Sequence, residues 1–222
     1  MTISDRTAIT RLPERGSSVR GELDALLDSV HLGHFGVADE SGRPVVLPTL
    51  VVRDGDRVIA HGSTGSRWMR RLADGAPTCL TVTALDAVVV ARSAFESSMR
   101  YRSAVLFGVC TALAGPEKLR ALDVATDTLI PGRTGEIRRP LPRELAATLV
   151  LALPIAEWSL KVSNEWPDDP AHDVAGNAWA GVVPLRTEYA DPLPAPDLRA
   201  GLPVPASVSL LIGRGHPAEP DL

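Results

Sequence analysis

The chain opens with a helical pattern and continues with the short alternating patterns of strands. Apolar residues recur at helical spacing over residues 21–30, which predicts a helix there. Beyond it, runs rich in β-branched residues are separated by turn clusters, and Asp54-Gly55 is the strongest hairpin signal in the chain. These patterns predict strands over residues 34–38, 45–52, 57–61, 78–84, 87–94, about 102–113 and 157–162.

Three more helices are predicted between or after these strands. One covers residues 67–73, because Ser66 is a good N-cap before it and Gly75 can end it. The others cover residues 115–129 and 142–148. Helices do not separate the strands regularly, and no glycine-rich dinucleotide fingerprint is present, so a parallel doubly wound sheet is disfavoured. The expected fold is mainly β, a small barrel with peripheral helices.

The chain length suits one domain with appendages. Residues 1–20 are expected to be a loose lead-in, residues 21–186 the domain, and residues 187–222 a proline-rich tail that is extended or drapes over a partner subunit.

Composition excludes several classes of protein. Among 222 residues, 45% are hydrophobic and the net charge is −4, which argues against a nucleic-acid binder that works by neutralising phosphates. The polar start lacks the apolar core of a signal peptide, and no apolar stretch can span a bilayer, so a cytoplasmic protein without a membrane contact is expected. Cys79 and Cys110 lie in apolar runs and are expected to be buried free thiols rather than a disulfide.

Residues 61–67 are the first candidate site. They join a predicted strand to a predicted helix start, where unpaired N–H groups and small side chains let an anion approach the backbone. The hydroxyl groups here can donate to an anion, and Arg67 offers a fork for phosphate oxygens. The alternative is a plain N-cap with an exposed arginine. The residues are His61, Gly62, Ser63, Thr64, Gly65, Ser66 and Arg67.

Residues 97–103 are the second candidate, because two arginines and several hydroxyl groups stand at the entrance of a strand. A solvated strand end is the alternative. Together, the two segments predict a clamp for a phosphorylated cofactor. No metal site is expected: His31 and His34 lack a third ligand, and the acidic residues around His172 suit a solvated loop. No nucleophile or paired-carboxylate constellation suggests hydrolysis.

Taken in order, the motifs resemble those of a known family. The matching segments are Arg15-Gly16, Gly42-Arg43-Pro44 with Pro48, His61-Gly62-Ser63, Ser66-Arg67, residues 80–83, residues 91–95, Tyr101-Arg102-Ser103, Phe107-Gly108, Pro131-Gly132-Arg133, residues 144–148 and residues 179–185. The chain resembles the pyridoxamine 5′-phosphate oxidase-like FMN-binding split-barrel family, in particular its branch related to nitroimidazole reductases, over roughly residues 12–186.

The resemblance implies a six-stranded antiparallel split barrel that forms a homodimer, with FMN in clefts between the subunits. It assigns the flavin phosphate to Ser66, Arg67 and the 101–103 segment, and the isoalloxazine ring to the strand at residues 48–51. The residues implied to bind the cofactor are Pro48, Thr49, Leu50, Val51, His61, Gly62, Ser63, Ser66, Arg67, Tyr101, Arg102, Ser103 and Trp179.

The predicted function is that of an FMN-dependent oxidoreductase acting on a small organic substrate. Relatives that oxidise pyridoxamine phosphate carry a basic residue after the serine–arginine pair, where this chain has Trp68, which argues against vitamin B6 as the substrate. No catalytic acid or base is assigned, since His61 is as well explained by a structural role as by proton relay. The alternatives are a flavin-binding carrier or sensor without turnover, and a split barrel that binds haem or a deazaflavin in place of FMN.

Overall fold

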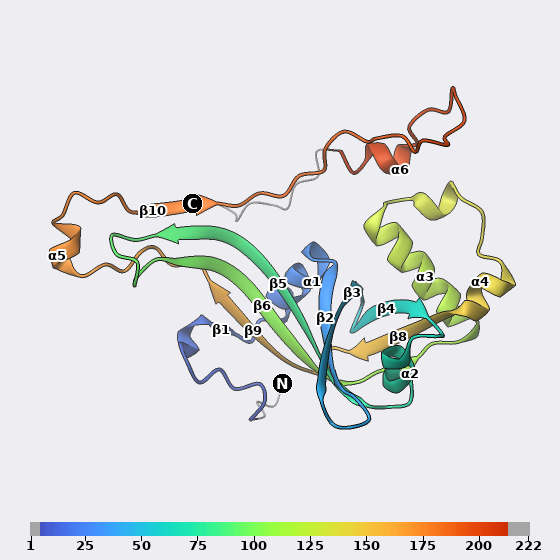
Figure 1. The fold of residues 1–222 in the computed structure, drawn as a ribbon, viewed down its shortest axis with the longest axis horizontal. Coiled ribbons are helices and arrows are strands. Elements are labelled where there is room, and N and C mark those ends of the chain that lie inside the picture. The colour runs from blue at the N-terminus through green and yellow to red at the C-terminus, as the bar shows by residue number, and fades with distance from the viewer. Residues whose placement is uncertain (1–4, 213–222) are drawn as a thin grey trace.

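The computed structural model describes residues 5–212, and its strands there form one ten-stranded sheet in which every pairing is antiparallel (Figure 1). The strands are β1 (Gly16–Ser17), β2 (Leu32–Ala38), β3 (Pro44–Asp54), β4 (Arg57–Ser63), β5 (Pro77–Val90), β6 (Ser98–Val109), β7 (Thr111–Ala112), β8 (Thr148–Pro154), β9 (Glu157–Ser163) and β10 (Gly181–Pro184). The helices are α1 (Arg20–Ser29), α2 (Arg67–Ala73), α3 (Gly115–Leu129), α4 (Pro142–Ala147), α5 (Ala171–Val174) and α6 (Ala206–Ser209), with 3-10 turns η1 (Pro13–Arg15) and η2 (Arg133–Gly135).

Strand β3 divides the sheet into two parts. The strand order is β1-β9-β6-β5-β2-β3-β4-β8-β7, and β10 adds to β5. Residues 44–50 of β3 pair with β2, whereas residues 51–54 pair with β4. Beyond this crossover β3 and β4 are not paired, and β4 continues alongside β8 as far as Ser63. The barrel is therefore split between the first half of β3 and the second half of β4.

The main core lies inside the curved sheet. Alternation along the strands turns one face inward, so that Phe35, Leu80 and Leu106 are fully buried. Helix α1 contributes Leu23, Leu26 and Leu27, which pack with these strand residues. A smaller apolar cluster lies on the outer face of β4 and β8 beneath α3, and it contains Ile59, Ala121 and Val150.

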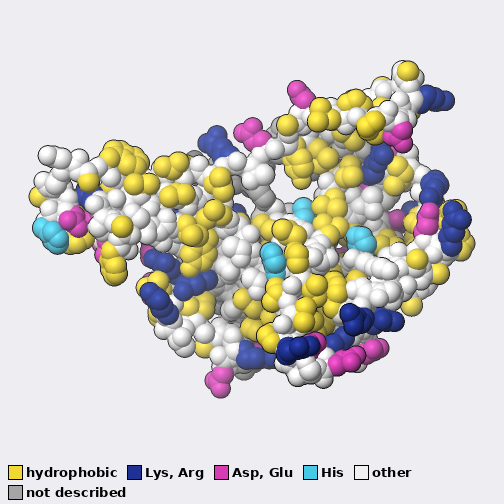
Figure 2. Space-filling model, in the orientation of Figure 1, with side chains coloured by type: hydrophobic (Ala, Val, Ile, Leu, Met, Phe, Trp, Pro, Cys, Tyr) yellow, Lys and Arg dark blue, Asp and Glu magenta, His cyan; other side chains and the backbone are white. Residues whose placement is uncertain are grey.

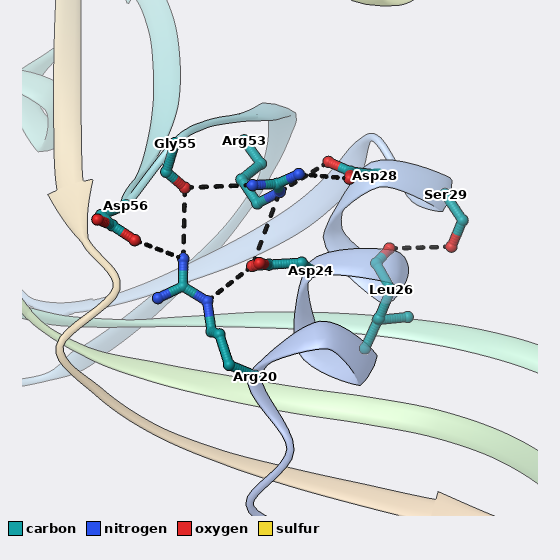
Figure 3. A network of polar contacts seen from close by, with 8 residues as sticks. All are labelled: Arg20, Asp24, Leu26, Asp28, Ser29, Arg53, Gly55 and Asp56. Atoms are coloured by element: carbon teal, nitrogen blue, oxygen red, sulfur yellow. Dashed lines mark hydrogen bonds and ion pairs between the residues drawn. The ribbon is translucent and has the colours of Figure 1, made fainter. Parts of the chain in front are cut away.

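A polar network fixes α1 to the β3–β4 turn (Figure 3). Arg53 donates two hydrogen bonds to Asp28, at 2.8 and 2.6 Å. Arg20 donates to Asp24 at 2.7 Å and to Asp56 at 2.9 Å. Because these arginines reach from one element to the other, the network orients the helix over the core that its leucines fill.

Strands β5 and β6 extend beyond the barrel as an arm, which β10 widens and α5 ends (Figure 1). The chain reverses direction at α5, and after β10 it continues along the molecule to α6, near the turn that follows α3. Among the described residues, no helix is both long and apolar enough to cross a bilayer.

The expected fold class is confirmed, and helices 67–73 and 115–129 have the predicted bounds. The described sheet has ten strands, whereas six were expected for the barrel, because short strands such as β1, β7 and β10 join the longer ones. The predicted turn at residues 85–86 is an irregularity within one long strand, β5, at a shift in register between Leu85 and Ala87. Strand β8 was not recognised because both of its faces are buried, which removes the alternation.

Two other expectations concern the lead-in and the cysteines. The lead-in is less loose than expected: Thr7 is buried, and Arg6 stacks on Phe107. Both cysteines are free thiols. Cys110 is buried, which raises the pKa of its thiol to about 12, whereas Cys79 is only half-buried.

Candidate functional site

The outer face of β2 and β3 carries an unusual combination of exposed apolar side chains and a histidine. In β2 the inner positions Phe35 and Val37 are buried, while Leu32 and His34 face outward and are exposed. His34 is opposite Pro48 in β3, and Leu32 is opposite Leu50. This face thus places two of the predicted cofactor residues beside an imidazole.

The other two residues of the predicted ring-binding strand point away from this face. Val51 is buried in the core, and its N–H donates to the carbonyl of His31 at 3.0 Å. Thr49 is opposite Gly33, on the inner side. However, the edge of β3 at residues 48–50 that faces β4 has no strand beside it, because of the split. Backbone groups along that edge are placed to bond a ligand.

His61 stands on the outer face of β4, on the other side of the split. Alternation puts it on the same side as Ile59, next to the apolar cluster under α3. Burial lowers the pKa of His61 below its ordinary value, which favours the neutral imidazole. Neither His61 nor His34 has a hydrogen-bond partner within residues 5–212. Figure 2 shows histidine side chains in the middle of this face, below the carboxyl-terminal segment.

The predicted phosphate segment forms a compact turn from β4 into α2. The N–H of Gly65 donates to the hydroxyl of Ser63 at 3.1 Å, and the N–H of Thr64 donates to the carbonyl of Ala147 at 3.0 Å. Ser66 is the N-cap of α2, but its hydroxyl makes no capping bond. Arg67 is exposed, and its guanidinium has no partner among the described residues. Ser66 and Arg67 are therefore both available to an external anion.

A groove of about 1200 Å³ opens beside this segment, between α2 and the turn that joins β2 to β3. Trp68 lies half-buried in it and stacks against Phe35, with 5.9 Å between ring centroids. The charged side chains that line the groove are four arginines and three carboxylates: Arg43, Arg67, Arg70, Arg71, Asp39, Glu40 and Asp74. Two of the arginines are already bonded, Arg43 to Asp39 and Arg71 to the carbonyl of Ala38. Sequence reasoning found only Arg67 of these four arginines, although the Arg-Trp-Met-Arg-Arg run puts three arginines on one short helix.

The second predicted segment is not next to the first in one chain. Strands β5, β2 and β3 lie between β6 and β4. Arg102 points to the inner side of the sheet, where it donates to Asp86 at 3.0 and 2.8 Å. Tyr101 and Ser103 point to the outer face, and the hydroxyl of Ser103 is 3.3 Å from that of Thr83. The strand order therefore does not join the two segments into a clamp within one chain, and Arg102 is already bonded to Asp86.

Trp179 is also distant from the predicted ring-binding strand of its own chain. It precedes β10, which pairs with residues 87–90 of β5 on the arm. His34 is opposite Thr81, so the nine residues from Thr81 to Val90 separate the two places by roughly 30 Å along β5. Within one chain, the register therefore does not bring Trp179 next to the predicted ring-binding strand.

Comparison with known proteins agrees with this architecture. The model of the pyridoxamine 5′-phosphate oxidase family matches residues 19–162. The chain belongs to this family. No curated protein matches the chain.

Two solved structures are similar to this family member over nearly their whole length. The FAD and haem binding protein from Mycobacterium smegmatis is 53% identical, with a TM-score of 0.87, and the match covers 90% of this chain and 98% of that one. The flavocytochrome Anf3 from Azotobacter vinelandii is 36% identical, with a TM-score of 0.88 and coverage of 95% and 98%.

A third structure, a putative 5-nitroimidazole antibiotic resistance protein from Bacteroides thetaiotaomicron, shares only the fold. It is 18% identical, with a TM-score of 0.56, over 66% of this chain and 86% of its own.

Proposed function

We propose that this protein is a redox protein that holds a flavin and a haem, as its two similar relatives are named to do. The observation that carries the proposal is the match to the Mycobacterium smegmatis protein, which is 53% identical and spans 98% of that chain. The flavin supplies one- or two-electron chemistry and the haem one-electron chemistry, while the protein supplies position and electrostatics.

The flavin fits the split between β3 and β4. Ser66 and Arg67 have free donors for a phosphate, and the open edge of β3 at residues 48–50 offers backbone groups to a ring. We propose FAD rather than the FMN expected from sequence. The groove continues past Arg67 to Arg70 and Arg71, which suits a second phosphate, and Trp68 lies in the same groove.

The haem fits the outer face that bears His34 and His61. Neutral imidazole is the form that binds iron, and burial keeps His61 in that form. Both histidines lack partners within the described residues, so neither nitrogen is committed elsewhere. Exposed Leu32 and half-buried Leu50 offer apolar contact to a macrocycle.

The separation of Tyr101 and Trp179 from the rest of the site supports a homodimer with cofactors at the subunit boundary. In the dimer, these residues of one protomer come next to the split of its partner. Turnover of a small organic substrate and a location in the cytoplasm stay predictions of the sequence.

The test is the absorbance spectrum of the purified protein after supply of haem, with the mass of the flavin released on denaturation. We expect a flavin spectrum, a Soret band that shifts on reduction, and the mass of FAD. A flavin without a Soret band would leave an oxidoreductase or a flavin carrier, the functions predicted from sequence. A protein that takes up neither FAD nor FMN contradicts the proposal.

A further inference from the structure

The carboxyl-terminal segment, residues 185–212, is attached to the rest of its own chain at two distant places. At its start, the N–H of Leu185 donates to the carbonyl of Asp86 in the arm, at 2.8 Å. At its end, Ser207 donates from its N–H and its hydroxyl to the two carboxylate oxygens of Glu136, at 3.0 and 2.5 Å. Ser207 is only 1% exposed, so this second attachment is buried.

Between these attachments, residues 186–205, here called the strap, are mostly exposed and belong to no strand of the sheet, apart from a single β-bridge at Glu188. Figure 2 shows openings between the strap and the body of the protein, and Figure 1 shows the strap crossing from the arm towards α3. Leu193 is 93% exposed and Tyr189 is 52% exposed. Arg186 and Arg199 have no side-chain partner in the part of the chain that the structure describes. Apolar side chains in an anchored segment indicate that something else occupies the space beneath it.

The similarity to the Mycobacterium smegmatis protein extends beyond the residues that match the family model. That match covers 90% of the chain, about 200 residues, so at least about 38 of the residues after Val162, where the family model ends, are matched. The similarity to the relative that is named for both FAD and haem therefore extends well past the residues that match the family model. The face that the strap crosses is the one with the histidines (Figure 2).

We propose that the strap encloses the haem against the outer face of the sheet and forms one wall of its site. This inference rests on the proposed haem site. The strap's apolar side chains contact the macrocycle, and Arg186 or Arg199 pairs with a propionate. The prolines at positions 192, 194, 196, 203 and 205 reduce the freedom of the segment, so that less conformational entropy is lost when haem binds.

Limited trypsin digestion of the full-length protein with bound flavin tests this enclosure. Arg186 and Arg199 are both exposed and neither precedes proline, so each is a cleavage site. With haem at about ten times its dissociation constant, cleavage after both should slow by about tenfold. Cleavage after exposed Arg11, in the lead-in, is the internal control and should not change.

The variant Ser207→Ala also tests whether the strap encloses the haem, and it leaves the strap in the chain. The variant loses a hydrogen bond to a carboxylate, and the dissociation constant for haem should rise about tenfold while that for flavin stays the same. Ser209→Ala is the matched control, because its hydroxyl bonds only locally, to the carbonyl of Pro205 at the N-cap of α6, at 3.2 Å.

The outcomes separate the two proposals. If the full-length protein shows no Soret band with added haem, the proposed haem function fails. If haem binds but neither protects the strap nor responds to Ser207→Ala, the haem function stands and the enclosure is wrong. Protection that depends on protein concentration and not on haem also overturns it, and assigns the strap to a second copy of the chain.

Discussion

At the scale of single residues, two arginines predicted for the same task have different surroundings. Arg67 follows an N-cap whose hydroxyl is free and has no partner of its own within residues 5–212. Arg102 is held by two hydrogen bonds to Asp86 on the inner side of the sheet. Both are arginines beside hydroxyl residues in the sequence. Only the direction of the side chain distinguishes a free donor from a structural ion pair.

Arg67→Ala should therefore weaken flavin binding. Loss of a charge-assisted phosphate contact costs on the order of 1.5–3 kcal/mol, or roughly 10- to 150-fold in the dissociation constant. Fluorescence quenching on titration with FAD and with FMN measures the dissociation constant of each flavin. Arg11→Ala, on the exposed lead-in, is the control with the same change in charge. An unchanged constant in Arg67→Ala would remove this arginine from the site.

At the scale of elements, two kinds of contact hold the site in position. One is the tight packing of neighbouring strands against β2, and the other is the set of ion pairs between elements. A Cβ added at Gly33 would lie 2.7 Å from a methyl group of Leu80 and 3.0 Å from two of Val51. The side of β2 opposite the histidine face thus has no room for a side chain at this position. Asp54, at the end of β3, binds arginines from β4 and α3 and so fixes α3 over the outer face.

Gly33→Ala and Gly21→Ala should change stability in opposite directions. The first overpacks the core and should lower the free energy of unfolding by about 1–3 kcal/mol. The second adds a methyl group in open space on α1, and should raise it by roughly 0.5–1 kcal/mol through helix propensity. Urea denaturation of both variants measures the difference. A Gly33→Ala variant as stable as the wild type would show that the contact relaxes without cost.

Asp54→Asn should lower the free energy of unfolding at neutral pH, and it should make that free energy less dependent on pH in the acid range. Hydrogen bonds from Arg120 and Arg57 hold the pKa of Asp54 below its usual value. Its contribution is therefore present above the unfolded-state pKa of about 3.9 and is lost as pH falls through the lower folded-state pKa. We expect a loss of about 1–2 kcal/mol at pH 7 that shrinks as the pH falls below about 3.9.

Thermal or urea unfolding between pH 2 and pH 7 measures this loss. Asp56→Asn is the control, because its side chain is 93% exposed and its ion pair with Arg20 should contribute under about 1 kcal/mol. Equal losses in the two variants would contradict the assigned role of Asp54.

At the scale of the whole molecule, the site is divided. Arg67 follows β4, next to the split between β3 and β4. Tyr101 lies in β6, three strands from β3 in the sheet, and Trp179 lies on the arm. Exposed apolar residues continue over the arm, including Val88 and Val183. The proposed homodimer would bring these separated parts together.

Light scattering should therefore give twice the mass of one chain at micromolar concentration. Val88→Asp, on the arm, should shift the protein towards monomer and weaken flavin binding at the same time, because it places a charge on an exposed apolar surface that the proposed dimer buries. Glu96→Lys, a charge change on the loop after β5, is the control. A monomer with undiminished flavin affinity contradicts a shared site.

Periodicity and local capping alone determined most of the elements. Helices 67–73 and 115–129 were predicted with their bounds, since their signals are local: an N-cap, a proline in the first turn and a terminating residue. The order of short motifs also indicated the family that the comparison established. A phosphate segment at Ser66 and Arg67 follows from the same local chemistry, because a helix start needs only neighbouring residues.

The tertiary structure alone decided which of these residues share a site. Strand order and register decide the direction of Arg102, the distance of Trp179 and the open edge of β3. They also decide the positions of His34 and His61, which have no hydrogen-bond partner within residues 5–212. These pairings join residues far apart in the sequence, and a one-residue change of register reverses every side chain. Strand β8 and the long β5 were misjudged for a related reason: burial on both faces and an irregular position within a strand remove the alternation from which strands are recognised.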